Sequence, residues 1–361
     1  MTATDASRFE RMTVQQYARE VRPHLPVAIF EPIPRRAMAL PVHLAIILGL
    51  AVYIVAAAPP WYISLAAAIV AGHSWACLAF LAHETLHHAV VRSRLFERLI
   101  GYFGLGLFCL SPTLWTAWHN QAHHGNTGDP AADPDGLGTL GSWHTSAGDR
   151  ALERFAPGSG HKRSAVFLLF TFSFHSLAVL INHSHRDDYY RRVSRRAVYT
   201  ETAAMFAFWS AVFFAIGAGN FLFVYAVPVV VANLVAMSYI ATNHFLNSLT
   251  AVNDPLVNSL SVRNPGWLER LHFQFGYHVE HHIFPTVSGR HGPVVRDALV
   301  RLYGDRYLSL SHPRALQLLY ARPKLHGTAD TVVDPRTMTA YSTLAPGALD
   351  MGAVGAATAS P

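Results

Sequence analysis

The sequence contains few charged residues and almost no cysteine. Asp, Glu, Lys and Arg make up 14% of its 361 residues, whereas a soluble domain carries about a quarter. Its two cysteines, Cys77 and Cys109, lie in apolar stretches, which excludes a disulfide framework and a cysteine-rich zinc or iron–sulfur site. Together with 51% hydrophobic residues, this composition indicates a membrane protein.

Long runs without any charge locate the membrane helices. The first run extends from Ala37 to His83 and is broken by Pro59-Pro60, and the second extends from Thr202 to Asn253 and is broken at 217–220. Each run is long enough for two spans of about 20 residues. We therefore predict an all-α integral membrane protein with about four transmembrane helices in two hairpins. The expected spans are 38–58, 62–82, 202–217 and 221–243.

The distribution of basic residues predicts the orientation. Arginines are frequent before Ala37 and after Asn182, and the two hairpin turns have none, which places both termini in the cytoplasm by the positive-inside rule. The net charge of +6 is thus a topology signal, and we expect no nucleic-acid partner. Two shorter apolar segments, 99–118 and 164–182, are predicted to be interfacial or re-entrant. The expected organisation is a cytoplasmic segment 1–37, a membrane domain 38–325 and a disordered tail 326–361.

Three clusters stand out among the 22 histidines. They read HxxxHH, HxxxHH and HxxHH, and each follows an apolar segment. Residues three and four apart lie on the same face of a helix, so each cluster can aim imidazoles in one direction. The clustered residues are His83, His87, His88, His119, His123, His124, His278, His281 and His282.

The number of clustered histidines favours two metal ions. Imidazole suits Zn, Cu, Fe and Ni, and nine imidazoles exceed the four ligands or so of a zinc site. The first and third clusters each follow a complete hairpin, so we expect both on the cytoplasmic side, where the active site would lie. The second cluster joins them if 99–118 enters and leaves the membrane on one face, and three glycines and Pro112 within it favour such a bend.

A zinc site is the alternative for the first cluster. His83-Glu84-Thr85-Leu86-His87 is an HExxH string, which in metalloproteases binds zinc through its two histidines while the glutamate activates water. A membrane metalloprotease would also be hydrophobic. Against this interpretation, His88 extends the string and six further clustered histidines would have no role.

At these residues the sequence resembles the membrane fatty acid desaturase family, over roughly 38–325. The resemblance rests on three histidine boxes in order, the charge-poor hairpins between them, and a third box that reads HVEHH followed by Ile-Phe-Pro. The family's second box usually reads HxxHH, so His119 is where this sequence departs from the pattern. The resemblance implies two iron ions held by the histidines, with O2 as co-substrate.

The same resemblance implies further site residues. The family often has an extra ligand near the end of its last span, which corresponds here to His244, with Asn243 beside it as a water-mediated ligand. Ligating histidines usually donate their other ring N–H to a carboxylate or carbonyl. The acidic candidates for this role are Glu84, Asp133, Asp135 and Glu280.

Desaturation of a fatty-acyl chain is the leading reaction that the resemblance implies. Hydroxylases, acetylenases and terminal-alkene-forming enzymes use the same iron centre and stay open, as does the carrier of the acyl group: membrane lipid, CoA, acyl-carrier protein or free acid. The sequence has neither the His-Pro-Gly-Gly signature of a fused cytochrome b5 nor a glycine-rich flavin or nicotinamide motif. We therefore expect an external electron donor such as ferredoxin or cytochrome b5. The Arg186–Arg196 cluster would be a docking face for it or an anchor to lipid headgroups.

Overall fold

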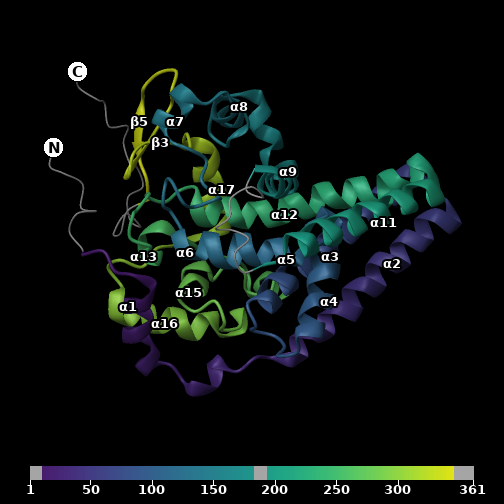
Figure 1. Cartoon of the computed structure of the whole chain (residues 1–361), viewed down its shortest axis with the longest axis horizontal. Coiled ribbons are helices and arrows are strands. Elements are labelled where there is room, and N and C mark those ends of the chain that lie inside the picture. The colour runs from purple at the N-terminus through teal and green to yellow at the C-terminus, as the bar shows by residue number, and fades with distance from the viewer. Residues whose placement is uncertain (1–9, 183–192, 345–361) are drawn as a thin grey trace.

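Long apolar helices dominate the structure, and they coincide with the charge-free runs of the sequence. The computed structural model describes residues 10–182 and 193–344. Its long helices are α2 (Ala39–Ala57), α3 (Trp61–Leu86), α9 (Phe167–Asn182), α11 (Arg195–Phe221) and α12 (Val227–His244). Helices α2, α3, α11 and α12 extend together away from the rest of the chain, to the right in Figure 1. The predicted all-α membrane class is confirmed.

The two hairpins break where proline and glycine predict. Ala58 ends α2 in a left-handed conformation, and Pro60 precedes the first residue of α3. Gly217, with φ of 75°, kinks α11, because glycine adopts this backbone region without steric cost. The π-helical segment η8 (Leu222–Ala226) then leads into α12. Helix α11 begins seven residues before the charge-free run and therefore includes Glu201.

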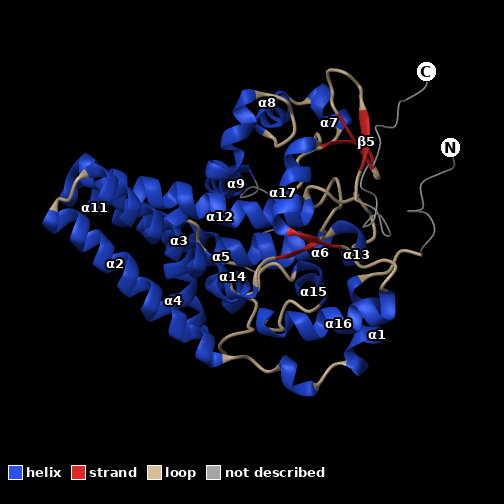
Figure 2. Cartoon of the chain, turned by 180° about the vertical axis from the view of Figure 1, so that it is seen from behind, coloured by secondary structure: helices blue, strands red, loops and turns tan. Residues whose placement is uncertain are grey.

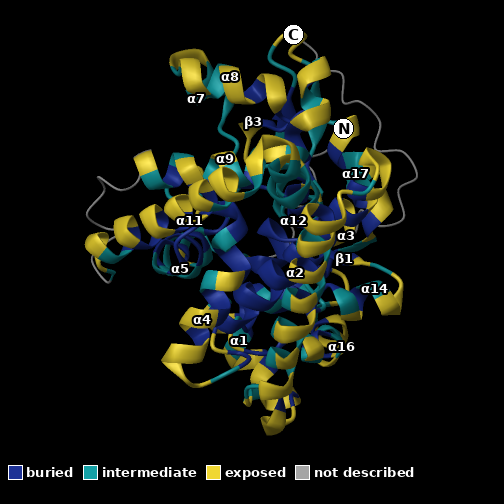
Figure 3. Ribbon diagram, turned by 90° about the vertical axis from the view of Figure 1, so that its right-hand side faces the viewer, coloured by how far each residue is buried: buried dark blue, intermediate teal, exposed yellow. Residues whose placement is uncertain are grey.

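Four helical stretches in the described part of the chain are long and apolar enough to cross a membrane. They are 34–57, Trp61–Leu86, Lys162–Ile181 and the 50-residue stretch Arg195–His244, which comprises α11 and α12. The third combines η7 (Lys162–Val166) with α9, the segment predicted to be interfacial or re-entrant. Large apolar side chains on the outer faces of these helices are exposed, Phe214 to 83%. Figure 3 shows this exposed surface in yellow around a buried centre, as expected for lipid-facing helices.

A bent helix pair carries the second histidine cluster. The first arm is α4 (Arg94–Leu105) with η5 (Gly106–Phe108), and the second contains α5 (Pro112–Trp115), η6 (Thr116–His123) and α6 (His124–Asn126). The arms meet at 97°, which confirms the bend predicted within 99–118. Glu201 of α11 fixes the corner, since its carboxylate accepts hydrogen bonds from the Ser111 hydroxyl and from the Thr113 amide (3.2 Å) and hydroxyl (2.9 Å).

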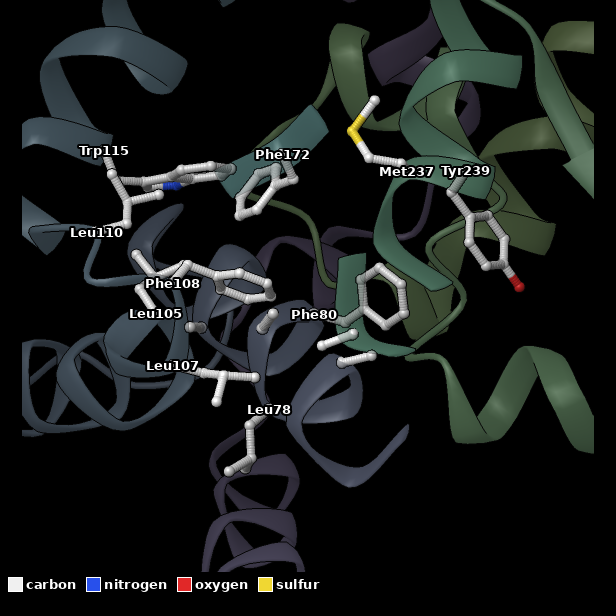
Figure 4. Close-up of a cluster of buried hydrophobic side chains, with 14 of the residues drawn as sticks. Leu78, Phe80, Leu105, Leu107, Phe108, Leu110, Trp115, Phe172, Met237 and Tyr239 are labelled. Atoms are coloured by element: carbon white, nitrogen blue, oxygen red, sulfur yellow. The ribbon is translucent and has the colours of Figure 1, made fainter. Parts of the chain in front are cut away.

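Helix α3 is the centre of the packing because small residues let its neighbours approach closely. A Cβ at Gly104 of α4 would lie 2.4 Å from the Leu78 carbonyl oxygen, and one at Gly72 would lie 2.8 Å from the Pro228 carbonyl oxygen of α12. Small residues serve the same purpose at many membrane helix interfaces. Figure 4 shows the resulting apolar core, in which side chains of α3 meet those of the bent pair, α9 and α12.

Short helices enclose the end of the bundle where α3 and α12 terminate (Figure 2). They are α1 (Val14–Val21), η2 (Arg22–His24), η3 (Val27–Phe30), η4 (Pro34–Met38), α13 (Pro255–Asn258), α14 (Gly266–Leu271), α15 (His278–Ile283), η9 (Gly289–His291), α16 (Gly292–Tyr303) and α17 (His312–Ala321). Strands β1 (Ser261–Arg263) and β2 (Ser309–Ser311) pair in parallel among them. This layer brings the third cluster, on α15, against the end of α3.

Part of the predicted disordered tail is ordered in the structure. Strands β3 (Leu325–Thr328), β4 (Thr331–Val333) and β5 (Ala340–Ser342) form an antiparallel sheet beside α7 (Leu140–Thr145) and α8 (Ala147–Phe155). The prediction of disorder is therefore wrong for 326–344. Composition alone did not reveal that Leu325, Val332 and Val333 are buried in this sheet. Residues 345–361, and most of the Arg186–Arg196 cluster, lie outside the described residues.

Candidate metal centre

The first histidine box sits at the end of α3. This helix has 26 residues, or about 39 Å at 1.5 Å per residue, which exceeds the ~30 Å hydrocarbon core of a bilayer. The helix is therefore long enough to extend beyond the apolar layer; its last turn carries His83, and His87 is the residue that caps the helix. Both imidazoles are buried, and His83 Nε2 lies 3.0 Å from His119 Nε2 of the second box.

The second box is wound as a π-helix rather than an α-helix. In η6 the hydrogen bonds run from residue i+5 to residue i, and the His124 amide bonds to the His119 carbonyl. The turn holds one residue more than an α-helical turn, so the HxxxHH spacing brings His119 and His124 together, with 3.3 Å between their Nε2 atoms. Single π-helical turns inside α-helices are frequent at functional sites. The added residue of this box is thus absorbed by the winding, and His119 belongs to the cluster.

The third box and the end of α12 complete the site. Ser261 of β1 caps α15, because its hydroxyl oxygen accepts from the amides of His278 (3.1 Å) and Val279 (3.0 Å). His278 Nε2 then lies 2.7 Å from His244 Nε2 and 3.1 Å from His282 Nε2. The remaining histidine of the box, His281, instead approaches the second box, with 3.1 Å between its Nε2 and that of His124.

Eight histidines of the three boxes, together with His244, form two adjacent groups, which we call group A and group B. Group A comprises His83, His87, His119, His124 and His281, whose candidate ligand atoms all lie within 4.8 Å of one another. Group B comprises His123, His244 and His282, with the same limit, and His278, whose Nε2 contacts two of them. The doubled histidines explain the two groups. Each doublet of the second and third boxes gives one imidazole to group A and the other to group B.

The nitrogen atoms of both groups fit metal ligands. Burial and neighbouring imidazoles hold the pKa of His278, His281 and His282 well below its usual value, so these rings are neutral, the form that binds a metal. The buried His87 Nε2 has no hydrogen-bond partner in the described part of the chain, although buried polar atoms are normally paired. A cation bound between the rings would give His87 Nε2 a partner and would also explain why Nε2 atoms of neighbouring histidines lie only about 3 Å apart.

His88 does not join either group. Helix α3 ends at Leu86, and His88 adopts a left-handed conformation with φ of 65°, which turns its side chain away from the face that carries His83 and His87. The side chain is 68% exposed, and its Nδ1 lies 2.6 Å from Glu97 Oε1. The prediction of His88 as a further ligand beside His83 and His87 is therefore wrong, because α3 ends at Leu86, two residues before His88, and the chain turns there.

The predicted acidic partners fall into two pairs. Asp133 Oδ1 accepts a hydrogen bond from His123 Nδ1 (2.9 Å), and Asp135 Oδ2 lies 3.4 Å from the same nitrogen. This contact leaves His123 Nε2 free to bind a metal. Burial would raise the pKa of Asp135, but the charges and hydrogen bonds of His123 and His175 hold it well below its usual value.

Glu84 and Glu280 bond to the protein around the site instead of to the boxes. Glu84 accepts from Arg36 Nε (2.7 Å), from the Ser288 hydroxyl and from the Gly289 amide. Glu280 accepts from the hydroxyls of Ser261 (2.6 Å) and Tyr307. Both carboxylates thereby join α3 or α15 to neighbouring segments and hold the helices that present the imidazoles.

Some contacts at the site were not predicted from the sequence. Thr127 donates its hydroxyl to the His123 carbonyl (2.7 Å), and the same oxygen lies 3.3 Å from His282 Nδ1. His244 Nδ1 faces the Asn258 carbonyl at 3.4 Å. Thr127 follows the second box directly, in the sequence His124-Gly125-Asn126-Thr127. The neighbouring Asn243 is fully buried, with both amide atoms unpaired among the described residues, as a residue that binds through a water molecule would be.

An apolar cavity of about 470 Å³ adjoins both groups. Its walls come mainly from α8, α9, α12 and the bent pair, and one end is formed by His83 and His119 of group A and His123, His244 and His278 of group B. Phe155 of α8 and Phe170 and Phe174 of α9 line it and are among the exposed large apolar side chains. A narrow apolar space of this size suits a hydrocarbon chain.

Comparison with known proteins identifies the family of the chain. The sequence model of the family described as "Fatty acid desaturase" matches residues 59–314. The matched segment contains all three histidine boxes and His244, and it ends before the C-terminal sheet. No curated protein matches the chain significantly.

Proposed function

The chain belongs to the fatty acid desaturase family, and on this basis we propose that it is an O2-dependent di-iron desaturase that introduces a double bond into a fatty-acyl chain. Family membership makes it a membrane oxidoreductase that acts on fatty-acyl substrates and depends on a metal. The identity of the metal, the oxidant and the reaction outcome are the parts that we propose.

The observation that carries the proposal is the meeting of two histidine groups with one apolar cavity. Five imidazoles in group A exceed the tetrahedral set of a structural zinc ion, whereas imidazole-rich sites with open positions suit iron. Two adjacent groups at the end of a hydrocarbon-sized space support a pair of metals that faces an unreactive alkyl chain. When bound, the irons would supply, with O2, the oxidising power to remove hydrogen from such a chain, which no side chain can do.

The residues of the chain hold this centre and keep it dry. His123, His282 and His244 have oxygen atoms of Asp133, Thr127 and Asn258 near their Nδ1 atoms, so their Nε2 atoms are directed inward. The aromatic side chains of the cavity exclude water and confine the acyl chain beside the histidines. The shape of the cavity decides which C–H bonds of the acyl chain reach the metal centre. Correct placement of the reacting atoms by itself accelerates such reactions strongly.

The contacts of Glu84 count against a zinc protease. In an HExxH protease the glutamate must activate a water molecule on the metal. Here Arg36, Ser288 and Gly289 occupy both oxygens of Glu84, and the histidines of the other boxes adjoin the HExxH pair. Hydroxylation, acetylenic bond formation and terminal-alkene formation stay as alternatives on the same centre, because they differ from desaturation only in how the oxidised chain resolves.

Metal analysis tests the centre. Protein purified in detergent from iron-supplemented cells should contain about two irons per chain, and substitution of His87 by Ala should lower this number. One zinc per chain without iron would refute the di-iron proposal and return the protease to consideration.

Lipid analysis tests the reaction. The chain should be expressed in a host that supplies ferredoxin or cytochrome b5, since we propose that its electrons come from such an external carrier. New unsaturated acyl chains would support desaturation. Hydroxy acids would instead indicate a hydroxylase, and terminal alkenes would indicate a terminal-alkene-forming enzyme. Cysteine-accessibility labelling of introduced sites in intact cells would test the proposed cytoplasmic location of both termini and of the histidine boxes.

A further inference from the structure

A second, polar cavity lies against group B on the side of the C-terminal sheet. It measures about 200 Å³ and is lined by residues of the 128–139 loop, the segment after α12, and β3. Asp135, Gly136, Leu137, His244 and Phe245 line both this cavity and the apolar one. The two spaces therefore share a wall that includes a histidine of the candidate metal centre.

A buried lysine lines this polar cavity. Lys324 is 4% exposed, and its Nζ donates to the carbonyls of Arg322 (2.6 Å) and Pro323 (3.3 Å). An ammonium group has three donors, so one remains for a further acceptor. No carboxylate pairs with it in the described part of the chain, whereas buried charges are normally paired. Burial and the neighbouring Arg322 lower the pKa of Lys324 to about 7, which shows how poorly the fold itself supports this charge.

Two more unsatisfied polar atoms belong to residues that line the same cavity. His326, 9% exposed, has a buried Nδ1 without a hydrogen-bond partner among the described residues, and so has Oδ1 of the buried Asn247. The four carboxylates of the cavity have hydrogen-bond partners instead: Asp133 has His123 and Gly128, Asp135 has Trp118 and His175, Asp129 has the amides of its own loop, and Asp149 has Ser146. The polar atoms of this cavity without a full set of partners among the described residues thus belong to Lys324, His326 and Asn247.

We infer that this cavity holds the carbonyl end of the acyl substrate, with a carboxylate or ester oxygen accepting a hydrogen bond from Lys324 and with His326 beside it. The inference rests on the proposed function, because the remainder of the chain would occupy the apolar cavity. The carbons next to group B would then be those a few bonds from the carbonyl group.

The cavity also limits the carrier of the acyl group. It offers one lysine and is lined by four aspartates, Asp129, Asp133, Asp135 and Asp149, so a polyphosphate carrier such as CoA, with several negative charges, is repelled more strongly than a head with one negative charge or none. A compact head, either a free carboxylate or a single ester, fits the volume and the donor. Lys324 and His326 lie beyond the family match, which ends at residue 314, whereas the other residues that line the cavity lie within it.

Binding of brominated probes tests the inference directly. Palmitic acid, methyl palmitate, palmitoyl-CoA and hexadecane, each brominated in the middle of the chain, should quench Trp115 and Trp118, which line the apolar cavity. The variant is Lys324→Met. Its matched control is Lys162→Met, since the sequence contains only these two lysines and Lys162 is exposed.

We expect Lys324→Met to bind palmitate about tenfold more weakly or worse, the loss of one charge-assisted hydrogen bond, with hexadecane binding unchanged. If methyl palmitate loses as much affinity as palmitate, the natural substrate is an ester. If only palmitate loses affinity, the natural substrate is a free acid. Unchanged hexadecane binding also shows that the variant is folded.

Equal affinities of wild type and Lys324→Met for palmitate and methyl palmitate would overturn the inference and leave the proposed function standing. Tighter binding of palmitoyl-CoA than of either, independent of Lys324, would overturn it as well. If no probe quenches either tryptophan, the apolar cavity is not an acyl site, and the proposed function fails with the inference.

Discussion

Replacement of Asp133 by Asn isolates the contribution of one carboxylate to the metal centre. Its Oδ1 accepts from His123 Nδ1 (2.9 Å) and from the Asp135 amide (3.1 Å), and its Oδ2 accepts from the Gly128 amide (2.8 Å). Asparagine has one acceptor oxygen and one NH2 group. Whichever way the asparagine side chain is turned, its NH2 group therefore faces a donor, His123 or Gly128, that now bonds to the Asp133 carboxylate.

Both orientations weaken metal binding, for different reasons. If the amide nitrogen faces His123, the imidazole must accept at Nδ1 and carry its proton on Nε2, the atom that should bind the metal. If the amide nitrogen faces Gly128, the loop that orients His123 loses its hydrogen bond. Removal of such a partner typically costs 10–100-fold in metal affinity, or about 1.4–2.7 kcal/mol.

The assay is retention of iron by purified protein against a graded series of Fe(II) buffers, with Asp129→Asn as the control. Asp129 lies in the same loop, and its Oδ1 accepts only from the amides of Ala131 and Ala132, a role that an asparagine oxygen can fill. Asp133→Asn should release half of its iron at a free Fe(II) concentration at least tenfold higher than the control does. Curves that coincide within twofold would show that the Asp133–His123 contact does not orient a ligand.

Three further predictions follow from contacts described above. His87→Ala should lower the iron content, whereas His88→Ala should leave it unchanged, because only the His87 imidazole lies in group A. Elemental analysis of both purified variants measures this. Equal losses of iron would contradict the assignment of His87 and not His88 to group A. Gly104→Ala should destabilise the protein by about 1–3 kcal/mol through overpacking, measured by thermal unfolding in detergent, with Gly49→Ala as a neutral control because a Cβ there meets nothing within 4 Å. Lys324→Met should raise the unfolding temperature below pH 7, where the native wild-type protein must hold a buried charge. The pKa of Lys324 falls from 10.5 in the unfolded chain to about 7 in the fold, so the cost of burying this charge disappears as the pH rises from 7 to 10.5. The difference in unfolding temperature should therefore shrink over this range, and a constant difference would refute the prediction.

The sequence predicted the membrane helices well because their signal is local. Absence of charge over a continuous run is visible without any knowledge of neighbours, and Pro60 and Gly217 act on their own backbone. The same locality explains the failure at 326–344, where the strands depend on burial against segments far away in the chain. Composition rich in small residues gave no indication of that contact.

The candidate site was predictable as a set of residues but not as a geometry. Spacing indicated that histidines of one box share a face, yet it could not show which member of each doublet turns to group A or to group B. That division depends on the relative rotation of η6 and α15, which long-range contacts such as Ser261 with His278 determine. For the same reason, the sequence could not show that Glu84 and Glu280 bind other partners or that Lys324 and His244 line the same cavity.

The π-helical winding of the second box bears on how histidine boxes should be compared between proteins. An inserted residue usually shifts every later side chain of a helix by about 100°, which would destroy a ligand set. Here the wider turn accommodates the three residues between His119 and His123 and still brings His119 Nε2 within 3.3 Å of His124 Nε2. Boxes with two or three intervening residues can therefore present equivalent ligands, and a motif of fixed length would discard homologous sites that differ only by one such turn.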